Sequence, residues 1–310
     1  MMKVLFMGTP DFSVPTLEAL YKAGHEILLV VSQADKAKGR GKKVAHTPVK
    51  EKALQLELPV FQPENVNSKE SIDTIKNTNP DVIVVVAYGQ ILKEDILKIP
   101  KYGCINVHAS LLPKYRGAAP INWAIINGEK HTGITTMMME KGLDSGDMLL
   151  KTETEINEEE TAGQLHDRLM NMGAELLIET LKKIDSGVLV KTPQNHNEAT
   201  YASMMTKELG KINWNESAIN IKNLVRGTQP WPGAYAMYKD INVKILEVDI
   251  VDKSVEGDNG EVVKVTEEGI FVNALDKCVV LKQIQFPGKR SMTISEFLRG
   301  NQFETGVLLK

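Results

Sequence analysis

The stretch CINVHASLLPKYRGAAP, residues 104–120, decides the fold because a short apolar run is followed at once by residues that cannot continue a strand. Alternate side chains of a β-strand project to the same face, so a strand at residues 103–107 and its continuation place Asn106 and His108 on one side. Pro113 and Gly117 follow. An amide and an imidazole are therefore expected at the carboxyl end of a strand, where open α/β sheets bind their ligands.

The residues before this stretch predict a β-α-β unit. Apolar runs at residues 4–7 and 27–31 flank a segment in which Ser13 is a candidate N-cap and Pro15 lies in the first turn of a helix. Such a crossover implies parallel strands. The run at residues 82–86 is entirely β-branched, as expected of a central strand that is covered on both faces.

The pattern of alternating strands and helices continues to about residue 185. Asn67 with Glu70 resembles a capping box for a helix that ends near Asn77. Further strands are predicted at residues 133–139 and 148–153, and leucines at helical spacing predict a helix at 162–184. Together these elements predict a doubly wound, mostly parallel, Rossmann-like α/β domain.

The pattern of predicted elements changes after residue 185. Residues 186–207 lose the apolar periodicity and are expected to form an exposed linker. A helix near residues 216–225 and several short strands separated by turn signals follow. We expect domains at 1–185 and 208–310, the second a small antiparallel β-barrel for which an OB-like topology is one possibility.

Composition excludes several functional classes. The chain has 310 residues, 42% hydrophobic and 25% charged, with a formal net charge of −3, so any contact with nucleic acid would have to be local. Two widely separated cysteines predict no disulfide framework, and the six histidines show no metal-ligand spacing. No run approaches the roughly 18 apolar residues of a membrane helix. We expect a cytoplasmic protein without a membrane anchor or a metal.

Three residues are candidates for chemistry. Asn106 and His108 combine an amide donor with a titratable ring, the groups needed to polarise a carbonyl and to manage a proton. Asp144 lies between glycines in GLDSGD, residues 142–147, and a carboxylate beside His108 would orient the ring and favour its protonated form. The structural alternatives are a buried histidine with satisfied hydrogen bonds and an ordinary turn, and the sequence alone does not place the two groups together.

One segment carries the positive charge that the whole chain lacks. In ADKAKGRGKKVAH, residues 34–46, five basic residues are opposed by Asp35 alone, and two glycines make the segment flexible. A solvated charged loop is the common explanation of such a run. The functional alternative is an arm that contacts phosphates with a strongly salt-dependent affinity.

Several of these segments together resemble the methionyl-tRNA formyltransferase family. The resemblance covers nearly the whole chain, through the segments FMGTPDFSVPTL (6–17), GRGKK (39–43), VVAYGQIL (85–92), NVHASLLPKYRGAAPI (106–121), GLDSGDML (142–149) and QPWPGAY (229–235). It implies transfer of a formyl group from 10-formyltetrahydrofolate to the α-amino group of methionyl initiator tRNA. It further implies a C-terminal tRNA-binding domain, and a cytoplasmic monomer is expected.

The resemblance also assigns roles to residues. It implies catalytic roles for Asn106, His108 and Asp144. It implies that the folate co-substrate contacts the SLLP segment, which comprises Ser110, Leu111, Leu112 and Pro113, and that tRNA contacts the basic segment, which includes Arg40, Lys42 and Lys43.

Three alternative functions remain open at this point. Related formyltransferases that modify small amines, such as glycinamide ribonucleotide or amino-sugar nucleotides, share the catalytic triplet, and a folate-dehydrogenase hydrolase domain shares the core. A non-enzymatic tRNA-binding protein would belong to a different class. The joint presence of Asn106, His108 and Asp144 argues against the last alternative, because a pure binding module does not need them together.

Overall fold

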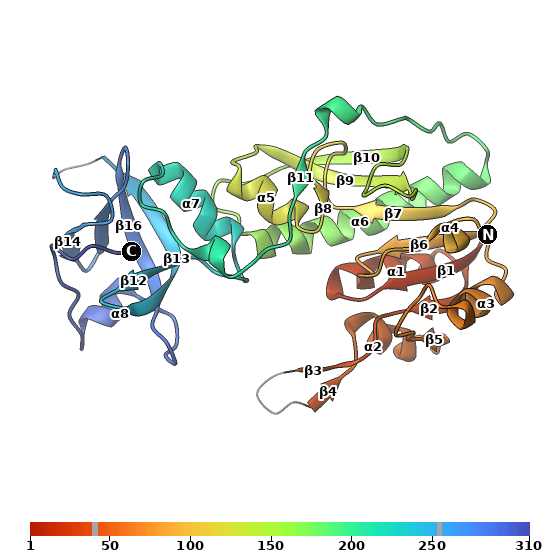
Figure 1. The fold of residues 1–310 in the computed structure, drawn as a ribbon, viewed down its shortest axis with the longest axis horizontal. Helices are drawn as coiled ribbons and strands as arrows, with labels where there is room; N and C mark the ends of the chain where they lie inside the picture. The colour runs from red at the N-terminus through yellow and green to blue at the C-terminus, as the bar shows by residue number, and fades with distance from the viewer. Residues whose placement is uncertain (39–42, 253–255) are drawn as a thin grey trace. The chain divides into compact units, whose positions relative to one another are not determined.

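The computed structural model describes residues 1–38, 43–252 and 256–310. The chain forms two compact units that interleave along the sequence. The first unit comprises residues 1–117, 131–154 and 166–201, and the second comprises residues 118–130, 155–165 and 202–310. Figure 1 shows the elements of each unit.

The first unit is built on a seven-stranded, mostly parallel sheet with the strand order β10-β9-β7-β6-β1-β2-β5 (Figure 1). β1 pairs in parallel with both β2 and β6, and β7 pairs in parallel with β6 but antiparallel with β9. The predicted doubly wound α/β architecture is confirmed. The strands are β1 (Lys3–Gly8), β2 (Glu26–Val31), β5 (Val60–Phe61), β6 (Val82–Val86), β7 (Cys104–His108), β9 (His131–Met138) and β10 (Met148–Glu155).

Helices cover this sheet. One face forms a buried cluster that joins Leu5, Ile83 and Cys104 to Ile75 and Ile96 of α3 and α4. On α6, a Cβ atom added at Gly173 would lie 2.9 Å from Cγ1 of Val107, so this helix passes close to β7. The helices are α1 (Val14–Lys22), α2 (Pro48–Gln55), α3 (Lys69–Asn77), α4 (Glu94–Leu97) and α6 (Ala162–Asp185), with a 3₁₀ turn at η1 (Asp11–Ser13).

The strand order reverses between β1 and β6. After β1 the chain continues to β2 on one side, and after β6 it continues to β7 on the other. Hydrogen bonds join the loops that follow β1 and β6. Ser13 Oγ donates to the carbonyl of Val86 at 2.6 Å, and Thr9 Oγ1 donates to that of Tyr88 at 2.8 Å. This reversal is the usual ligand-binding point of a doubly wound sheet.

Of the two predicted helix caps, the one at Ser13 is confirmed in position and the one at Asn67 is wrong. Ser13 occupies the N-cap position of α1, but its hydroxyl makes no cap hydrogen bond because it is bound to Val86. The N-cap of α3 is Ser68, which accepts from the backbone N–H of Ser71, so the predicted capping box at Asn67 is wrong. The Asn67 amide instead donates to Ile91 O at 2.8 Å.

The second unit contains an antiparallel sheet with the order β12-β13-β16-β15-β14, and β17 also pairs with β16. The predicted small antiparallel β-domain is confirmed, and its sheet forms a half-barrel. The elements are α5 (Pro120–Ile126), η3 (Glu208–Gly210), α7 (Ala218–Gly227), β12 (Tyr235–Tyr238), β13 (Ile241–Val251), β14 (Val262–Thr266), β15 (Gly269–Asn273), β16 (Cys278–Gln285), β17 (Met292–Thr293) and α8 (Ile294–Leu298).

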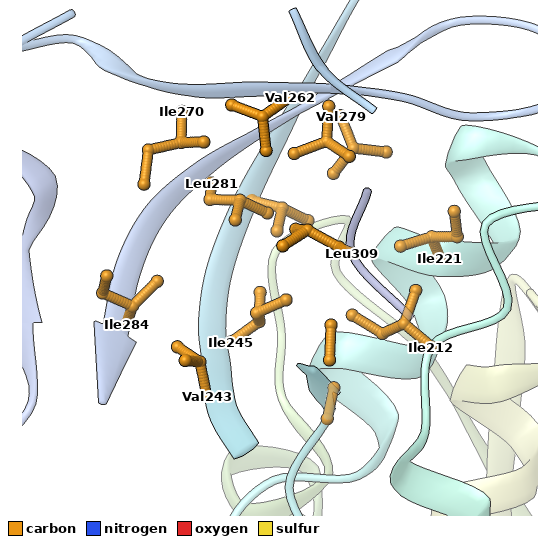
Figure 2. Close-up of a cluster of buried hydrophobic side chains, with 14 of the residues drawn as sticks. Ile212, Ile221, Val243, Ile245, Val262, Ile270, Val279, Leu281, Ile284 and Leu309 are labelled. Atoms are coloured by element: carbon orange, nitrogen blue, oxygen red, sulfur yellow. The ribbon is translucent and has the colours of Figure 1, made fainter. Parts of the chain in front are cut away.

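The core of the second unit lies between this sheet and α7. Figure 2 shows Ile221 of α7 with Ile245, Leu281 and Leu309 among the aliphatic side chains that fill it. On the other side of α7, Gly227 allows close contact with α5, because a Cβ atom there would lie 2.6 Å from Cγ1 of Ile126. Asn122 of α5 donates to the carbonyl of Gly227 at 2.8 Å.

Candidate active site

Strand β7 carries both Asn106 and His108, one residue longer at its carboxyl end than predicted. Asn106 lies opposite Val85 of β6 and Met137 of β9, and His108 lies opposite Thr135 of β9. The two side chains therefore share one face of the sheet. His108 is buried, with 5% of its surface exposed, whereas Asn106 is half-buried. This difference leaves the amide accessible beside a ring that is held in place.

Both ring nitrogens of His108 face acceptors. Nε2 lies 2.9 Å from the carbonyl oxygen of Tyr115, which can only accept, so Nε2 must donate. Nδ1 lies 3.7 Å from Oδ2 of Asp144. Only the imidazolium form presents an N–H to each of these acceptors. The ring is therefore oriented with Nε2 toward the carbonyl of Tyr115 and Nδ1 toward the carboxylate of Asp144.

The carboxylate of Asp144 joins the two residues of β7. Its Oδ2 accepts a hydrogen bond of 2.8 Å from the backbone N–H of Gly117, and its Oδ1 lies 3.5 Å from Nδ2 of Asn106. The structure thus brings together the three predicted residues of the site, which are separated by up to 38 positions in the sequence. Asp144 has a φ of +46°, a left-handed conformation that aspartate tolerates better than most residues.

The turn that contains Asp144 is held by Gln194, which the sequence analysis missed. Gln194 Nε2 donates to the carbonyls of Asp144 and Gly146, each at 2.8 Å. Its Oε1 accepts from Nε and Nη2 of Arg116 at 3.0 and 2.7 Å. Gln194 is 6% exposed within a segment that was expected to be a solvated linker. Its sequence context, PQNHN, carries no signal of burial.

The predicted folate-contacting segment is fixed mainly through its backbone. Thr135 Oγ1 donates to the carbonyl of Ser110 at 2.7 Å and accepts from the N–H of Leu112 at 3.1 Å. Ser110 and Leu112 are buried, with 1% and 0% exposure, so Leu111 and Pro113 are the two members with accessible side-chain surface. Lys151 donates to the carbonyl of Leu112, and partial burial lowers the pKa of its amine.

Comparison with known proteins identifies the family. The family described as Formyl transferase matches residues 2–181, and its C-terminal domain matches residues 204–302. Methionyl-tRNA formyltransferases of Clostridioides difficile and Clostridium acetobutylicum are each 53% identical to this chain, over 99% and 100% of its length and over their full lengths. The chain belongs to the methionyl-tRNA formyltransferase family.

More distant solved structures share the fold of this methionyl-tRNA formyltransferase family member. An N-formyltransferase from Helicobacter canadensis, solved with folinic acid and dTDP-3-aminofucose, aligns with a TM-score of 0.66 at 20% identity, over 91% of this chain and 99% of that one. HypX from Aquifex aeolicus, solved with tetrahydrofolic acid, aligns with a TM-score of 0.61 at 17% identity, over 96% of this chain and 47% of that one.

The basic segment that resembles the tRNA-contacting loop of methionyl-tRNA formyltransferases contains two short strands that pair with each other. β3 (Lys36–Lys38) pairs antiparallel with β4 (Lys43–Ala45). Arg40 and Lys42 lie outside the described residues, and Lys43 is described only as the first backbone position of β4. The predicted role of these three side chains therefore stays a prediction.

Asp35 holds the base of this hairpin. Its carboxylate accepts from Gln62 at 2.8 Å, from Lys50 at 2.6 Å and contacts His46 at 2.7 Å. Burial would raise the pKa of Asp35, but the hydrogen bonds from Gln62, Lys50 and His46 outweigh it and hold this pKa well below its usual range. The carboxylate is thus ionised wherever the hairpin is folded near neutral pH.

Other chemistry finds little support in this methionyl-tRNA formyltransferase fold. Cys104 shares the face of Asn106 but is 1% exposed, and burial raises the pKa of its thiol to about 12, which makes it a poor nucleophile. Across residues 1–38, 43–252 and 256–310, no group of three metal-binding side chains gathers. Within the same ranges, no helix has the length and apolar character needed to span a bilayer.

Proposed function

We propose that this protein transfers the formyl group of 10-formyltetrahydrofolate to the α-amino group of methionyl initiator tRNA. The observation that carries the proposal is the contact of one carboxylate, Asp144, with both Asn106 and His108, in a chain 53% identical over its whole length to methionyl-tRNA formyltransferases. An amide donor, an imidazole ring and a carboxylate at a strand end suit the attack of an amine on a carbonyl carbon.

The distances around Asp144 support a role for the two donors in stabilising an oxyanion. Asn106 Nδ2 and His108 Nδ1 lie 3.5 and 3.7 Å from the carboxylate, longer than strong hydrogen bonds. Both donors therefore remain available to form a hydrogen bond with a substrate atom. His108 offers Nδ1 for this purpose, because its Nε2 already donates to Tyr115. The oxyanion that forms when the amine attacks would receive one hydrogen bond from each side chain.

The reaction needs no nucleophile from the protein. The neutral amine of the methionyl group forms a bond to the formyl carbon, and the bond from that carbon to N10 of the folate then breaks. The amine loses one proton and the leaving nitrogen gains one, so the protons balance. Asp144 would stabilise the imidazolium of His108 and align a water molecule that carries the proton between the two nitrogens.

The folate co-substrate would lie along the SLLP segment. Leu111 and Pro113 offer apolar surface, while the backbone of the segment is fixed by Thr135. Two solved structures with the same fold carry folate derivatives, folinic acid in one and tetrahydrofolic acid in the other. The SLLP segment begins two residues after His108, so the formyl carbon would lie beside the donors of β7.

The tRNA partner would be held by the basic segment, through Arg40, Lys42 and Lys43, and by the C-terminal unit. The formal net charge of the chain is −3, so a polyanion requires local basic surface of this kind. Contacts to phosphates make binding salt-dependent. The proposal includes a monomeric enzyme that acts in the cytoplasm without a metal.

The test is formyl transfer by the purified protein from 10-formyltetrahydrofolate, with methionyl initiator tRNA, a charged elongator tRNA and free methionine as parallel acceptors. Transfer to the initiator alone supports the proposal and shows that the tRNA body is recognised. Transfer to amino-sugar nucleotides or glycinamide ribonucleotide, with no product on any tRNA, would replace it with a small-amine formyltransferase. Folate hydrolysis without any acceptor would indicate a hydrolase.

A further inference from the structure

Gln194 is buried in a segment that is otherwise exposed. Among residues 190–198 the neighbouring side chains are partly or fully exposed, whereas Gln194 is 6% exposed. Its amide is fully engaged: the oxygen accepts twice from Arg116, and the nitrogen donates to the carbonyls of Asp144 and Gly146. A buried amide with four hydrogen bonds holds two parts of the chain in one arrangement.

We propose that Gln194 is a positioning residue for Asp144. It links the guanidinium of Arg116 to the backbone of the turn at residues 142–147 and thereby sets the place of the Asp144 carboxylate against Asn106 and His108. The inference rests on the proposed formyl transfer, in which Gln194 would act through the position of Asp144 and not through contact with a substrate.

The chemistry at this position is specific to an amide. Guanidinium groups only donate and carbonyl oxygens only accept, so the residue between them must accept on one side and donate on the other. Glutamate would still accept from Arg116 but would present oxygen to the carbonyls of Asp144 and Gly146. Methionine has a similar length and would lose all four hydrogen bonds. Comparison of the two substitutions therefore separates the hydrogen bonds to Arg116 from those to the carbonyls of Asp144 and Gly146.

Strand β8 (Arg116–Gly117) holds Asp144 at two points. Gly117 donates its N–H to the carboxylate oxygen Oδ2 at 2.8 Å, and Arg116, which is 3% exposed, holds the backbone of Asp144 through Gln194. The carbonyl of Asp144 belongs to the same residue as the carboxylate, so fixing its peptide plane limits where the side chain can point. Loss of either hold should move the carboxylate without removing it.

The far end of the turn is held to β9, where the backbone N–H of Met138 donates to the carbonyl of Asp147 at 2.8 Å, but its tip is more exposed. Leu143 is 60% exposed, and Asp144 has a positive φ. The turn also approaches β9 closely at Gly146, where a Cβ atom would lie 2.1 Å from the carbonyl oxygen of Met138. Gln194 donates to the carbonyl of the same residue, Gly146, and so helps to keep the turn against β9.

The experiment compares Gln194→Glu and Gln194→Met with the same two substitutions at Gln55, the exposed last residue of α2. If Gln194 positions Asp144, both Gln194 variants should lose about 10²-fold in kcat, the size of effect expected when a catalytic group is misplaced by about 1 Å. KM for the folate should stay within about twofold, because Gln194 is buried and its amide makes its four hydrogen bonds within the protein. The Gln55 variants should match the unchanged enzyme.

A second measurement does not depend on which amine is formylated. In protein labelled at its six histidines, the ring resonances of His108, assigned with His108→Gln, should shift in both Gln194 variants and stay constant in both Gln55 variants. This result stands even if the acceptor proves to be a small amine, so failure of the proposed function would remain distinguishable from failure of the inference.

Two outcomes would overturn the inference. If Gln194→Glu kept full kcat while Gln194→Met lost it, Gln194 would only anchor its own segment on Arg116. If both variants lost activity in proportion to their loss of folded protein, with unchanged His108 resonances in the folded fraction, its role would be limited to stability.

Discussion

The backbone N–H of Gly117 donates to Oδ2 of Asp144 at 2.8 Å, so a main-chain group fixes the carboxylate on which the candidate site converges. A backbone donor survives any side-chain substitution at the carboxylate. The charge of Asp144 can therefore be removed while its position is kept. This separation makes the role of the negative charge directly testable.

Asp144→Asn should lower kcat by about 10²-fold or more, the usual cost of disturbing one electrostatic element of an acyl-transfer site. With its amide oxygen in the place of Oδ2, the asparagine still accepts from Gly117, but its amide nitrogen then faces the Nδ2 donor of Asn106. The neutral amide oxygen near Nδ1 of His108 no longer stabilises an imidazolium. tRNA binding should be unchanged. Asp147→Asn, in the same turn, is the matched control, and steady-state kinetics with both variants make the measurement. Full turnover by Asp144→Asn would remove the charge from the mechanism.

Asn106→Ala should reduce kcat by about 10²–10³-fold, the cost of one lost oxyanion donor. Its effect on thermal stability should be small because Asn106 is half-buried and its contact to Asp144 is long, at 3.5 Å. Cys104→Ala, two residues earlier on the same strand face, is the control. Because its thiol is buried, this control should retain its kcat and lose only folding free energy. Equal loss of kcat in both variants would point to a general effect on β7.

The fold was predictable from the sequence because its strands are apolar runs of distinct type. The β-branched run at residues 82–86 matches β6 to the residue, and the helix predicted at 162–184 matches α6 to within one residue. Short elements with a weak apolar pattern escaped prediction. The two-residue strand β5 and the four-residue helix α4 are too short to show a period, and tertiary packing stabilises them.

The site was predictable only in part. Strand alternation placed Asn106 and His108 on one face, but their approach to Asp144 depends on contacts between distant segments. Gln194 and Thr135 were not identified as residues of the site, because hydrogen bonds from a side chain to a remote backbone leave no local pattern. The capping box at Asn67 failed for a similar reason, since the Asn67 amide binds the loop at Ile91 instead of its own helix.

Thr135→Val should raise KM for the folate more than it lowers kcat. Valine has nearly the shape of threonine but leaves the carbonyl of Ser110 and the N–H of Leu112 without their buried partner, at a cost of about 1–3 kcal/mol for an unsatisfied group. The SLLP segment should shift as a result. Thr154→Val on the neighbouring strand β10 provides a control at a more exposed position. A pure loss of kcat with unchanged KM would contradict a binding role for the segment.

Arg40→Ala should weaken the use of tRNA more than the use of folate. Each phosphate contact adds to the salt dependence of binding. The slope of the logarithm of tRNA affinity against the logarithm of salt concentration should therefore be smaller by about one for this variant. Kinetics at several salt concentrations, with each substrate varied in turn, measure both effects. Lys69→Ala, at the exposed start of α3, is the control. Equal losses toward both substrates would indicate a folding role for the segment.

Asp35→Asn should make the free energy of unfolding less dependent on pH in the acid range. The pKa of Asp35 is held below its ordinary value, because hydrogen bonds from Gln62, Lys50 and His46 outweigh the effect of burial. A carboxyl group with a lowered pKa stabilises the folded state above its unfolded pKa of about 4, and this stability is lost as the pH falls below that value. The free energy of unfolding in urea should therefore be lower for Asp35→Asn at pH 7. The difference from the unchanged protein should shrink as the pH falls from about 5 toward 2. Asp95→Asn, at an exposed position on α4, should show no such convergence. Parallel profiles for Asp35→Asn and the unchanged protein would mean that the hydrogen bonds at the base of the β3–β4 hairpin do not depend on the ionised carboxylate.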